Sequence, residues 1–381
     1  MRILQVVARY YPEIQFGGPP RKIHDLSRGL AQRGHRVRVV TFHSTQRTAA
    51  AVELDGIEVR YLPWLGWGER QVPLDLGSLA AAVRESDVVH TYGLYNLVCP
   101  AAALLALRAG RPYVLEPLGM YTPRARKLWA KRVYNGLLTS WMSRHAARVI
   151  ATSPGEMAEL AGLVDSRRLV LRRNGIDIDL YRTLPPAERF RTSHGILDGE
   201  RVILYVGRIS PIKNLELLVQ AFEAASLEQA RLVLVGPALE PGYLQKLVDL
   251  IGELNLEGRV LLTGPLYGED KLCALAAADL FVLPSLMESY GNAAAEAVAA
   301  GVPVLLTEGC GIAPQVDGRA GMVVSAGVSA LEQGLRSMME DRTVRGRLTG
   351  QMGQVRKELS WDEPLAQTEQ LYEAVTGNGS Q

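Results

Sequence analysis

The sequence predicts an α/β protein of two doubly wound units in tandem, each a parallel sheet with crossover helices. The chain has 381 residues, which is long for a single domain. Strand and helix signals alternate along it, as parallel sheets with crossover helices require. A loop rich in proline and charge covers residues 183–198, and the alternation restarts after it. Two such units would face a ligand cleft at the carboxyl ends of their strands.

The first half opens with a strand over residues 2–7 and a helix over residues 20–32. Ile23, Leu26 and Leu30 recur at helical spacing and form one apolar face. Gly34 then ends the helix. Further strands are expected over residues 37–41, 56–62, 87–90, 113–116, 148–151 and 169–171.

The second half repeats this organisation. A last helix follows Trp361, with Leu365, Leu371 and Tyr372 among its apolar residues. We therefore expect one domain over residues 1–185 and a second over residues 186–360. Strands of the second domain are expected over residues 201–206, 231–235, 259–262, 280–283 and 302–306.

The composition is that of a globular protein, but the charge is unevenly distributed. Hydrophobic residues make up 48% of the chain and charged residues 22%. Residues 1–185 hold 26 Lys and Arg against 15 Asp and Glu, a net charge of +11, and the remainder carries −9. The basic half should meet something anionic, such as a phosphate-bearing molecule or a lipid surface.

Signals for disulfides, export and membrane insertion are missing from the sequence. Cys99, Cys273 and Cys310 show neither metal-ligand spacing nor a disulfide framework. The first residues are typical of a strand and not of a signal peptide. No apolar run approaches the roughly 20 residues that span a bilayer. The expected location is the cytosol.

The segment MESYGNAAAEAVAAG, after the strand at 280–283, carries the richest chemistry. Residues 289–292 would open a helix whose free backbone N–H groups and dipole favour a phosphate. Glu288 would lie in the loop before this helix. Glu296 would lie about one turn inside it, where a carboxylate can accept two ribose hydroxyls. The alternative is a capping Glu and a solvent-facing Glu without a ligand.

A pair of cations follows the strand at 201–206. The strand ends at Gly207, and Arg208 and Lys213 lie in the loop before an amphipathic helix. Two cations beside a helix N-terminus suit a diphosphate leaving group, on which charge develops as a bond breaks. The alternative is that both are ordinary solvated loop cations. This alternative is less favoured because the cation pair and the Glu pair follow strands of one sheet.

Two glycines, Gly17 and Gly18, follow the first strand in the loop YYPEIQFGGPPRK. They would let the backbone approach a ligand closely before the first helix. The loop lacks the G-x-G-x-x-G pattern of dinucleotide-binding proteins, which disfavours a nicotinamide oxidoreductase. A simple flexible loop is the competing interpretation.

Together these pieces resemble glycosyltransferase family 4, retaining enzymes of the GT-B fold with two Rossmann-like domains. The set is specific, and its members run in the expected order across nearly the whole chain. They are Gly17-Gly18, DVVHTYGL at 87–94, RNGID at 173–177, GRISPIKN at 207–214, the Glu288/Glu296 pair, GVPVLLT at 301–307 and Trp361.

The resemblance implies roles for most of these residues. Arg208 and Lys213 would hold the diphosphate, Glu296 the ribose and Glu288 the transferred sugar. The last helix, residues 361–376, would cross back onto the N-terminal, acceptor-binding domain. The implied donor-binding residues are Gly17, Gly18, Gly207, Arg208, Lys213, Glu288, Ser289, Tyr290, Gly291, Asn292 and Glu296, of which Arg208, Lys213 and Glu288 would be catalytic.

One position departs from the family pattern. Many relatives place a His or Arg after the strand at 113–116, where it contacts the donor sugar. This chain has LEPLGMYTP, so Leu118 takes that place. Glu116, His90 or the backbone could serve the sugar instead, although His90 is also typical of a structural histidine at a strand end. Arg124, shortly after, is a further candidate for contacting the acceptor or sugar.

The stretch from residue 117 to residue 155 holds seven Lys or Arg and no Asp or Glu. Trp129, Val133, Leu137 and Trp141 recur every four residues, which predicts a helix with an apolar stripe. One interpretation is a core-packing helix with a basic outer face. The other is a surface at 124–148 that docks on anionic lipid at the inner face of a membrane.

The expected reaction is transfer of a sugar, a hexose by preference, from a nucleotide diphosphate sugar to a glycan or lipid-linked acceptor. UDP is preferred over GDP and ADP, and nucleic acid is not an expected partner. No nucleophile–base pair is evident, which favours front-face displacement with retention. Because Arg208 and Lys213 serve the diphosphate, no metal or cofactor is required, and we discount Asp177 and Asp179 as ligands. The alternatives are a nucleotide-sugar epimerase or hydrolase, and a catalytically degenerate sugar-nucleotide-binding protein.

Overall fold

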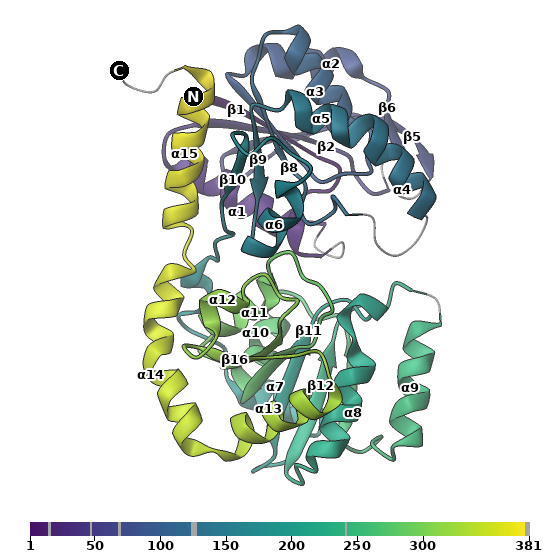
Figure 1. The fold of residues 1–381 in the computed structure, drawn as a ribbon, viewed down its shortest axis with the longest axis vertical. Helices are drawn as coiled ribbons and strands as arrows, with labels where there is room; N and C mark the ends of the chain where they lie inside the picture. The colour runs from purple at the N-terminus through teal and green to yellow at the C-terminus, as the bar shows by residue number, and fades with distance from the viewer. Residues whose placement is uncertain (14–16, 46–47, 68–69, 123–127, 241, 378–381) are drawn as a thin grey trace. The chain divides into compact units, whose positions relative to one another are not determined.

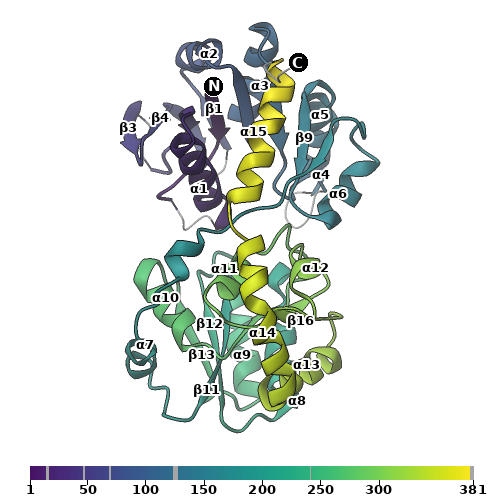
Figure 2. The ribbon, with the colours of Figure 1, turned by 90° about the vertical axis from the view of Figure 1, so that its left-hand side faces the viewer.

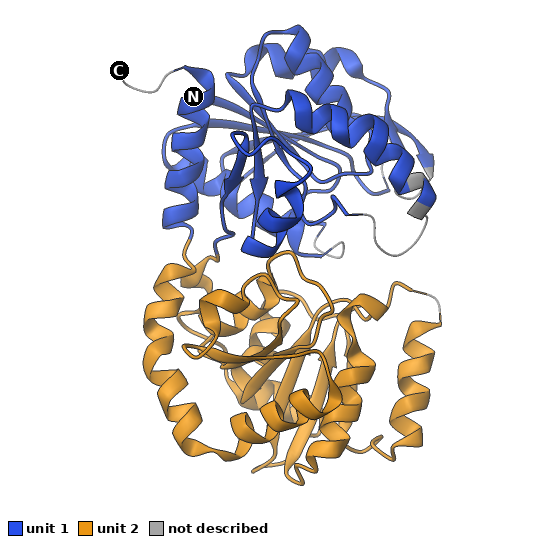
Figure 3. Ribbon diagram, viewed as in Figure 1, with its two compact units in different colours: residues 1–175, 361–381 blue, residues 176–360 orange. Residues whose placement is uncertain are grey.

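A computed structural model describes residues 1–13, 17–45, 48–67, 70–122, 128–240 and 242–377. The chain forms two compact units, shown in different colours in Figure 3. Unit 1 comprises residues 1–175 and 361–381, and unit 2 comprises residues 176–360. The chain therefore leaves unit 1 after Gly175 and returns to it at Trp361.

Unit 1 is built on an eight-stranded sheet of order β10-β9-β8-β7-β1-β2-β4-β3 (Figure 1). Its neighbouring strands are parallel except for the β3–β4 pair. The chain winds outward from β1 in one direction and from β7 in the other, so these two strands form the topological switch point. The strands are β1 (Arg2–Val7), β2 (Arg36–Thr41), β3 (Ala50–Leu54), β4 (Ile57–Tyr61), β7 (Val88–Tyr92), β8 (Tyr113–Glu116), β9 (Arg148–Ala151) and β10 (Leu169–Leu171).

Helices cover both faces of this sheet. Helix α1 (Gly18–Gln32) and the C-terminal helix α15 (Asp362–Thr376) pack on one face, and α15 lies against α1 and β7 (Figure 2). The other face is covered by α2 (Leu76–Glu85), α3 (Val98–Arg108), α5 (Ser140–His145) and α6 (Pro154–Ala161). A separate hairpin of β5 (Trp64–Trp67) and β6 (Arg70–Pro73) lies beside α3.

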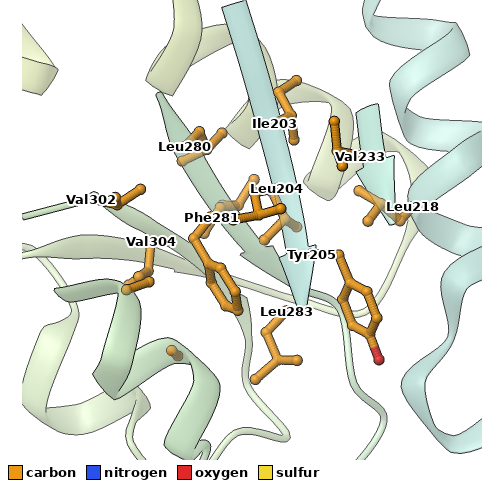
Figure 4. Close-up of a cluster of buried hydrophobic side chains, with 14 of the residues drawn as sticks. Ile203, Leu204, Tyr205, Leu218, Val233, Leu280, Phe281, Leu283, Val302 and Val304 are labelled. Carbon is orange, nitrogen blue, oxygen red and sulfur yellow. The ribbon is translucent and has the colours of Figure 1, made fainter. Parts of the chain in front are cut away.

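Unit 2 is built on a six-stranded, all-parallel sheet of order β13-β12-β11-β14-β15-β16. Its switch point lies between β11 and β14. The apolar side chains of these two strands are buried together, as Figure 4 shows for Leu204 and Phe281. The strands are β11 (Arg201–Val206), β12 (Ala230–Val235), β13 (Val260–Gly264), β14 (Leu280–Leu283), β15 (Val304–Thr307) and β16 (Gly321–Val324).

The helices of unit 2 alternate with these strands, so the predicted α/β class with two parallel-sheet units is confirmed. The helices are α7 (Ala187–Ser193), α8 (Leu215–Ala225), α9 (Tyr243–Glu253), α10 (Gly268–Ala277), α11 (Asn292–Ala299), α12 (Ala313–Val316), α13 (Val328–Glu340) and α14 (Arg342–Glu358).

Three local expectations need correction. The stretch 183–198 is not a plain loop, because α7 forms within it and buries Phe190. Strands β3, β5, β6 and β16 were not predicted. The expected helix with Trp129, Val133, Leu137 and Trp141 on one face is interrupted by a π-helical turn.

This interrupted segment consists of α4 (Leu128–Tyr134), the π-helical turn η2 (Asn135–Thr139) and α5. An extra residue in a helical turn rotates the faces that follow it. Trp141 consequently packs against the core of unit 1, whereas Trp129, Val133 and Leu137 are exposed. The core-packing interpretation of this stripe is therefore wrong for three of its four residues.

Candidate functional site

The predicted donor-binding residues of unit 2 gather at its switch point. Strands β11 and β14 are parallel neighbours, so the loops that follow them leave the same edge of the sheet. The backbone N–H of Leu286 donates to the carbonyl of Ile212 at 3.0 Å and joins the two loops directly. Ligands of open α/β sheets bind outside the carboxyl ends of strands at such a point.

The loop after β11 presents an exposed cation. Gly207 is required there because a Cβ atom would lie 2.6 Å from the Tyr205 hydroxyl. That hydroxyl, at the end of the buried Tyr205 ring (Figure 4), donates to the Arg208 carbonyl at 2.8 Å. The Arg208 side chain is exposed, and no carboxylate in the described part of the chain pairs with it. Its guanidinium is therefore available to an anion.

Lys213 and Glu288 form an ion pair across the two loops. Only 12% of the Lys213 side chain and 22% of the Glu288 side chain are exposed to solvent. The Glu288 backbone is fixed as well, because its N–H donates to Gly309 at 2.8 Å and its carbonyl accepts from Gly311 at 2.9 Å. Both side chains are thus held at the carboxyl edge of the sheet before any ligand arrives.

Helix α11 begins at Asn292, as the sequence predicts. Gly291, which precedes it, has a φ of +106°, a conformation that favours glycine. Ser289 is half-buried, and Tyr290 is buried with its carbonyl accepting from the Ile312 N–H at 2.6 Å. The first N–H groups of α11 have no partner within the helix, which suits an anion.

Glu296 lies one turn inside α11, at the predicted depth. Its carboxylate pairs with Lys271 Nζ of α10 at 2.9 Å. Sequence reasoning missed Lys271, since nothing in the run GEDKLCALAA distinguishes it from a solvated helix lysine. The ion pair orients the Glu296 carboxylate and leaves it half-buried.

Gly17 and Gly18 lie at the start of α1 in unit 1. Gly17 precedes the helix with a φ of +104°, and Gly18 is its first residue. Pro19 and Pro20 follow, and proline lacks a backbone N–H. The amides that could meet an anion at this end are therefore those of the two glycines and of Arg21.

His90 and Glu116 lie in the interior of unit 1 with no exposed surface. His90 Nδ1 lies 2.7 Å from the Tyr372 hydroxyl and 2.9 Å from that of Tyr92, and burial lowers the pKa of the imidazole to about 3. His90 is therefore a neutral structural histidine that ties β7 to α15. Where they lie, neither His90 nor Glu116 can contact a sugar, which corrects that assignment.

Glu116 is held by two cations that sequence reasoning missed. Lys22 from α1 and Arg172, which follows β10, both pair with its carboxylate. Burial alone would favour the neutral acid, but Arg172 and Lys22 lower the pKa of Glu116 to about 2. Burial in turn lowers the pKa of Lys22 to about 8. The three side chains fasten α1 and the end of β10 to β8.

Leu118 has a φ of +58°, an unusual conformation for a residue with a side chain. The next residue, Gly119, donates its N–H to the buried carboxylate of Glu156 at 2.6 Å, which fixes this turn after β8. The side chain of Leu118 is apolar, as the sequence shows. Arg124 lies outside the described residues.

An open pocket of about 520 Å³ lies at the amino ends of the unit 1 strands, where Arg148 begins β9 and Arg168 precedes β10. In the described residues, no His, Cys, Asp or Glu side chains form a cluster of three that could hold a metal ion. No helix among them is both long and apolar enough to cross a membrane.

Comparison with protein families matches both halves of the chain. Residues 186–353 match the model for glycosyl transferases group 1, and residues 17–175 match the model for a glycosyl transferase 4-like domain. The D-inositol 3-phosphate glycosyltransferase of Mycobacteroides abscessus is 30% identical over 77% of this chain and 70% of its own length. That of Mycobacterium tuberculosis is 28% identical over 78% of this chain and 65% of its own length.

Solved structures resemble this chain over nearly its whole length. Sucrose-phosphate synthase from Thermosynechococcus elongatus has a TM-score of 0.80 at 21% identity, over 99% of this chain and 100% of its own. Anabaena HepE in complex with UDP and glucose has a TM-score of 0.79 at 21% identity, over 98% and 100%. The fold is GT-B, and the protein is a glycosyltransferase. The chain belongs to family 4 of these enzymes, the glycosyl transferases group 1.

Proposed function

We propose that this chain is a retaining, metal-independent transferase that moves a hexose from a UDP-sugar to a phosphate-bearing or lipid-linked acceptor. The observation that carries the proposal is the switch point of unit 2. There an exposed Arg208, the Lys213–Glu288 pair and the first turn of α11 with Glu296 converge on two neighbouring loops. These are groups for a diphosphate, a sugar and a ribose.

The diphosphate would be bound by Arg208, Lys213 and the first N–H groups of α11. Fixed cations that face the leaving group stabilise the charge that develops as the glycosidic bond breaks. These cations would neutralise the diphosphate, as a divalent ion does in metal-dependent transferases. Glu288, already paired with Lys213, would then face the sugar, and Glu296 would accept the ribose hydroxyls.

Front-face displacement fits this set of groups. The acceptor oxygen bonds to the anomeric carbon on the face that the diphosphate leaves, and its proton passes to a departing phosphate oxygen. The chain then supplies position and charge stabilisation rather than a covalent intermediate.

The donor and acceptor classes have separate support. Anabaena HepE structures contain UDP and UDP-glucose. The mycobacterial relatives are named as glycosyltransferases of D-inositol 3-phosphate, a phosphate-bearing acceptor. Residues 1–185 carry a net charge of +11, which suits an anionic acceptor. Exposure of Trp129, Val133 and Leu137 supports peripheral contact of the stretch 124–148 with an anionic membrane.

The test is product analysis with UDP-hexoses and acceptors. We expect UDP release to depend on an acceptor, and the product to retain the anomeric configuration of the donor. UDP release without an acceptor, or an altered donor sugar, would identify a hydrolase or an epimerase. Binding of UDP without any turnover, across phosphorylated and lipid acceptors, would identify a degenerate binding protein.

A further inference from the structure

An exposed apolar stripe runs along α4 and η2 in unit 1. Trp129, Val133 and Leu137 expose 75%, 53% and 68% of their surfaces. Trp129 and Val133 are four residues apart in α4 and therefore lie on one side of it, and Leu137 follows in η2. Large apolar side chains gathered in this way mark an interaction surface, whereas isolated ones do not.

Helix α3, which adjoins α4, also exposes leucines. Leu97, Leu104 and Leu107 are exposed on or beside it. The two segments touch, because Tyr134 of α4 donates its hydroxyl to the carbonyl of Asn96 at 2.6 Å. Together these leucines and the α4–η2 stripe form a surface that we call the α3–α4 face.

The neighbouring elements extend the α3–α4 face. Helix α3 packs against α2 and β6, and Figure 1 shows the β5–β6 hairpin on the same side of unit 1 as α3 and α4. Leu65 and Val72 of the hairpin are exposed, as are Leu74 and Leu76 at the start of α2. The other side of the sheet differs: the described residues of α1 and α15 expose no large hydrophobic side chain.

Exposed cations without a described counter-charge lie on α3, α4 and α5. The segments 98–108 and 128–145 contain no Asp or Glu. Arg108, Arg132 and Arg144 are exposed, and no described carboxylate pairs with them. A protein partner with an apolar patch would not need this excess of positive charge, whereas an anionic lipid surface attracts both features.

We propose that the α3–α4 face docks unit 1 on an anionic phospholipid surface, with Trp129 and the leucines entering the headgroup region. The proposal extends the membrane contact named under the proposed function from one basic stretch to a face of several elements. The arginines would meet lipid phosphates, and the face would bind reversibly, without a spanning helix.

Sedimentation with vesicles tests this docking. The chain should bind vesicles that contain phosphatidylglycerol and should leave pure phosphatidylcholine vesicles largely unbound. Trp129→Ser, Val133→Ser and Leu137→Ser combined should lower the partition coefficient at least about tenfold, because exposed apolar area no longer enters the lipid. A matched control is Leu197→Ser, Leu239→Ser and Val248→Ser in unit 2, which also removes three exposed apolar side chains and should bind like wild type.

Charge variants separate the two contributions. Arg108→Gln, Arg132→Gln or Arg144→Gln should each weaken binding about fivefold at low salt, and added salt should reduce that difference. Undiminished binding by the triple serine variant would overturn the proposal, as would a wild-type chain that ignores anionic vesicles. Transfer to a soluble acceptor, measured without vesicles, distinguishes these outcomes from failure of the proposed function.

Discussion

Lys213 and Glu288 neutralise each other in the absence of a donor, and Glu296 and Lys271 do the same one turn into α11. A donor that binds at these residues would therefore replace existing ion pairs instead of meeting four unpaired charges. The sequence indicated three of these residues through their positions after strands of one sheet. It could not indicate Lys271, Lys22 or Arg172, because their partners are set by tertiary contacts between distant elements.

The two loop cations should be needed for turnover more than for folding. Arg208→Ala and Lys213→Ala are each expected to lower kcat about 100-fold or more, because leaving-group charge loses a fixed counter-charge. Steady-state kinetics with a saturating UDP-sugar measures this. Lys246→Ala, an exposed lysine on α9, is the control and should remain fully active. Near-normal turnover in both loop variants would refute the proposal that Arg208 and Lys213 stabilise the leaving diphosphate.

Substitutions of Glu288 and Glu296 should have different effects on UDP binding and on turnover. Glu296→Gln is expected to weaken binding of free UDP, since the amide no longer accepts two ribose hydroxyls. Glu288→Gln should lower kcat and bind UDP almost normally, because Glu288 faces the sugar. Titration calorimetry with UDP, beside kinetics, separates the two effects. Equal losses of UDP affinity would refute this division.

His90 should make the protein sensitive to acid. Burial lowers its pKa from 6.5 to about 3, so between these values the unfolded chain binds a proton that the folded chain does not. Stability should consequently fall as the pH drops from 6.5, by up to about 1.4 kcal/mol per pH unit. Urea unfolding at pH 6.5 and pH 5 should show a smaller drop in His90→Gln. His24, whose pKa is also lowered by burial, remains in both proteins.

At the scale of elements, the sequence predicted best where a strand is buried and bounded by loops. The expected bounds of β1, β8, β9, β10, β11 and β14 agree with the structure. Strand β3 was missed because AAVEL lies exposed at the sheet edge and lacks an apolar alternation. Helix α7 was missed because Pro185 and Pro186 resemble loop residues, although proline is tolerated before a first helical turn.

Gly291 should limit how α11 begins. Gly291→Ala is expected to destabilise the protein by about 1–3 kcal/mol, because a side chain at positive φ is strained. The new Cβ atom would also lie 3.1 Å from Ile312. UDP affinity should fall with stability, since the N–H groups of α11 shift. Gly350→Ala, inside α14 with open space around it, should be neutral or slightly stabilising by comparison.

At the scale of the whole molecule, both units share one plan, a parallel sheet with a topological switch point at which the candidate site residues follow the strands. Unit 2 has charged side chains there, whereas unit 1 has Gly17 and Gly18 at the start of α1 and keeps its charged cluster inside. Family resemblance anticipated the architecture and the unit 2 residues. The structural interpretation of His90 is confirmed, whereas the interior position of Glu116 was not anticipated, since its burial depends on the helices that cover the sheet.

The protein should be active without added metal. Activity is expected to persist in excess EDTA, because Arg208 and Lys213 supply fixed positive charge to the diphosphate. Assays with EDTA, and with magnesium or manganese restored, measure this. Complete loss of activity with EDTA, reversed by either ion, would mean that Asp177 and Asp179, or other carboxylates, bind a metal ion that the reaction requires.

The return of the chain to unit 1 at Trp361 has a consequence for synthesis on the ribosome. Unit 1 lacks α15 until the 185 residues of unit 2, from 176 to 360, have been made. At about 5–20 residues per second, this takes on the order of 10–40 s. Meanwhile the apolar surface that Leu365 and Tyr372 later cover stays open to water, and His90 lacks one hydroxyl partner. The first unit to emerge is therefore the last to complete its fold.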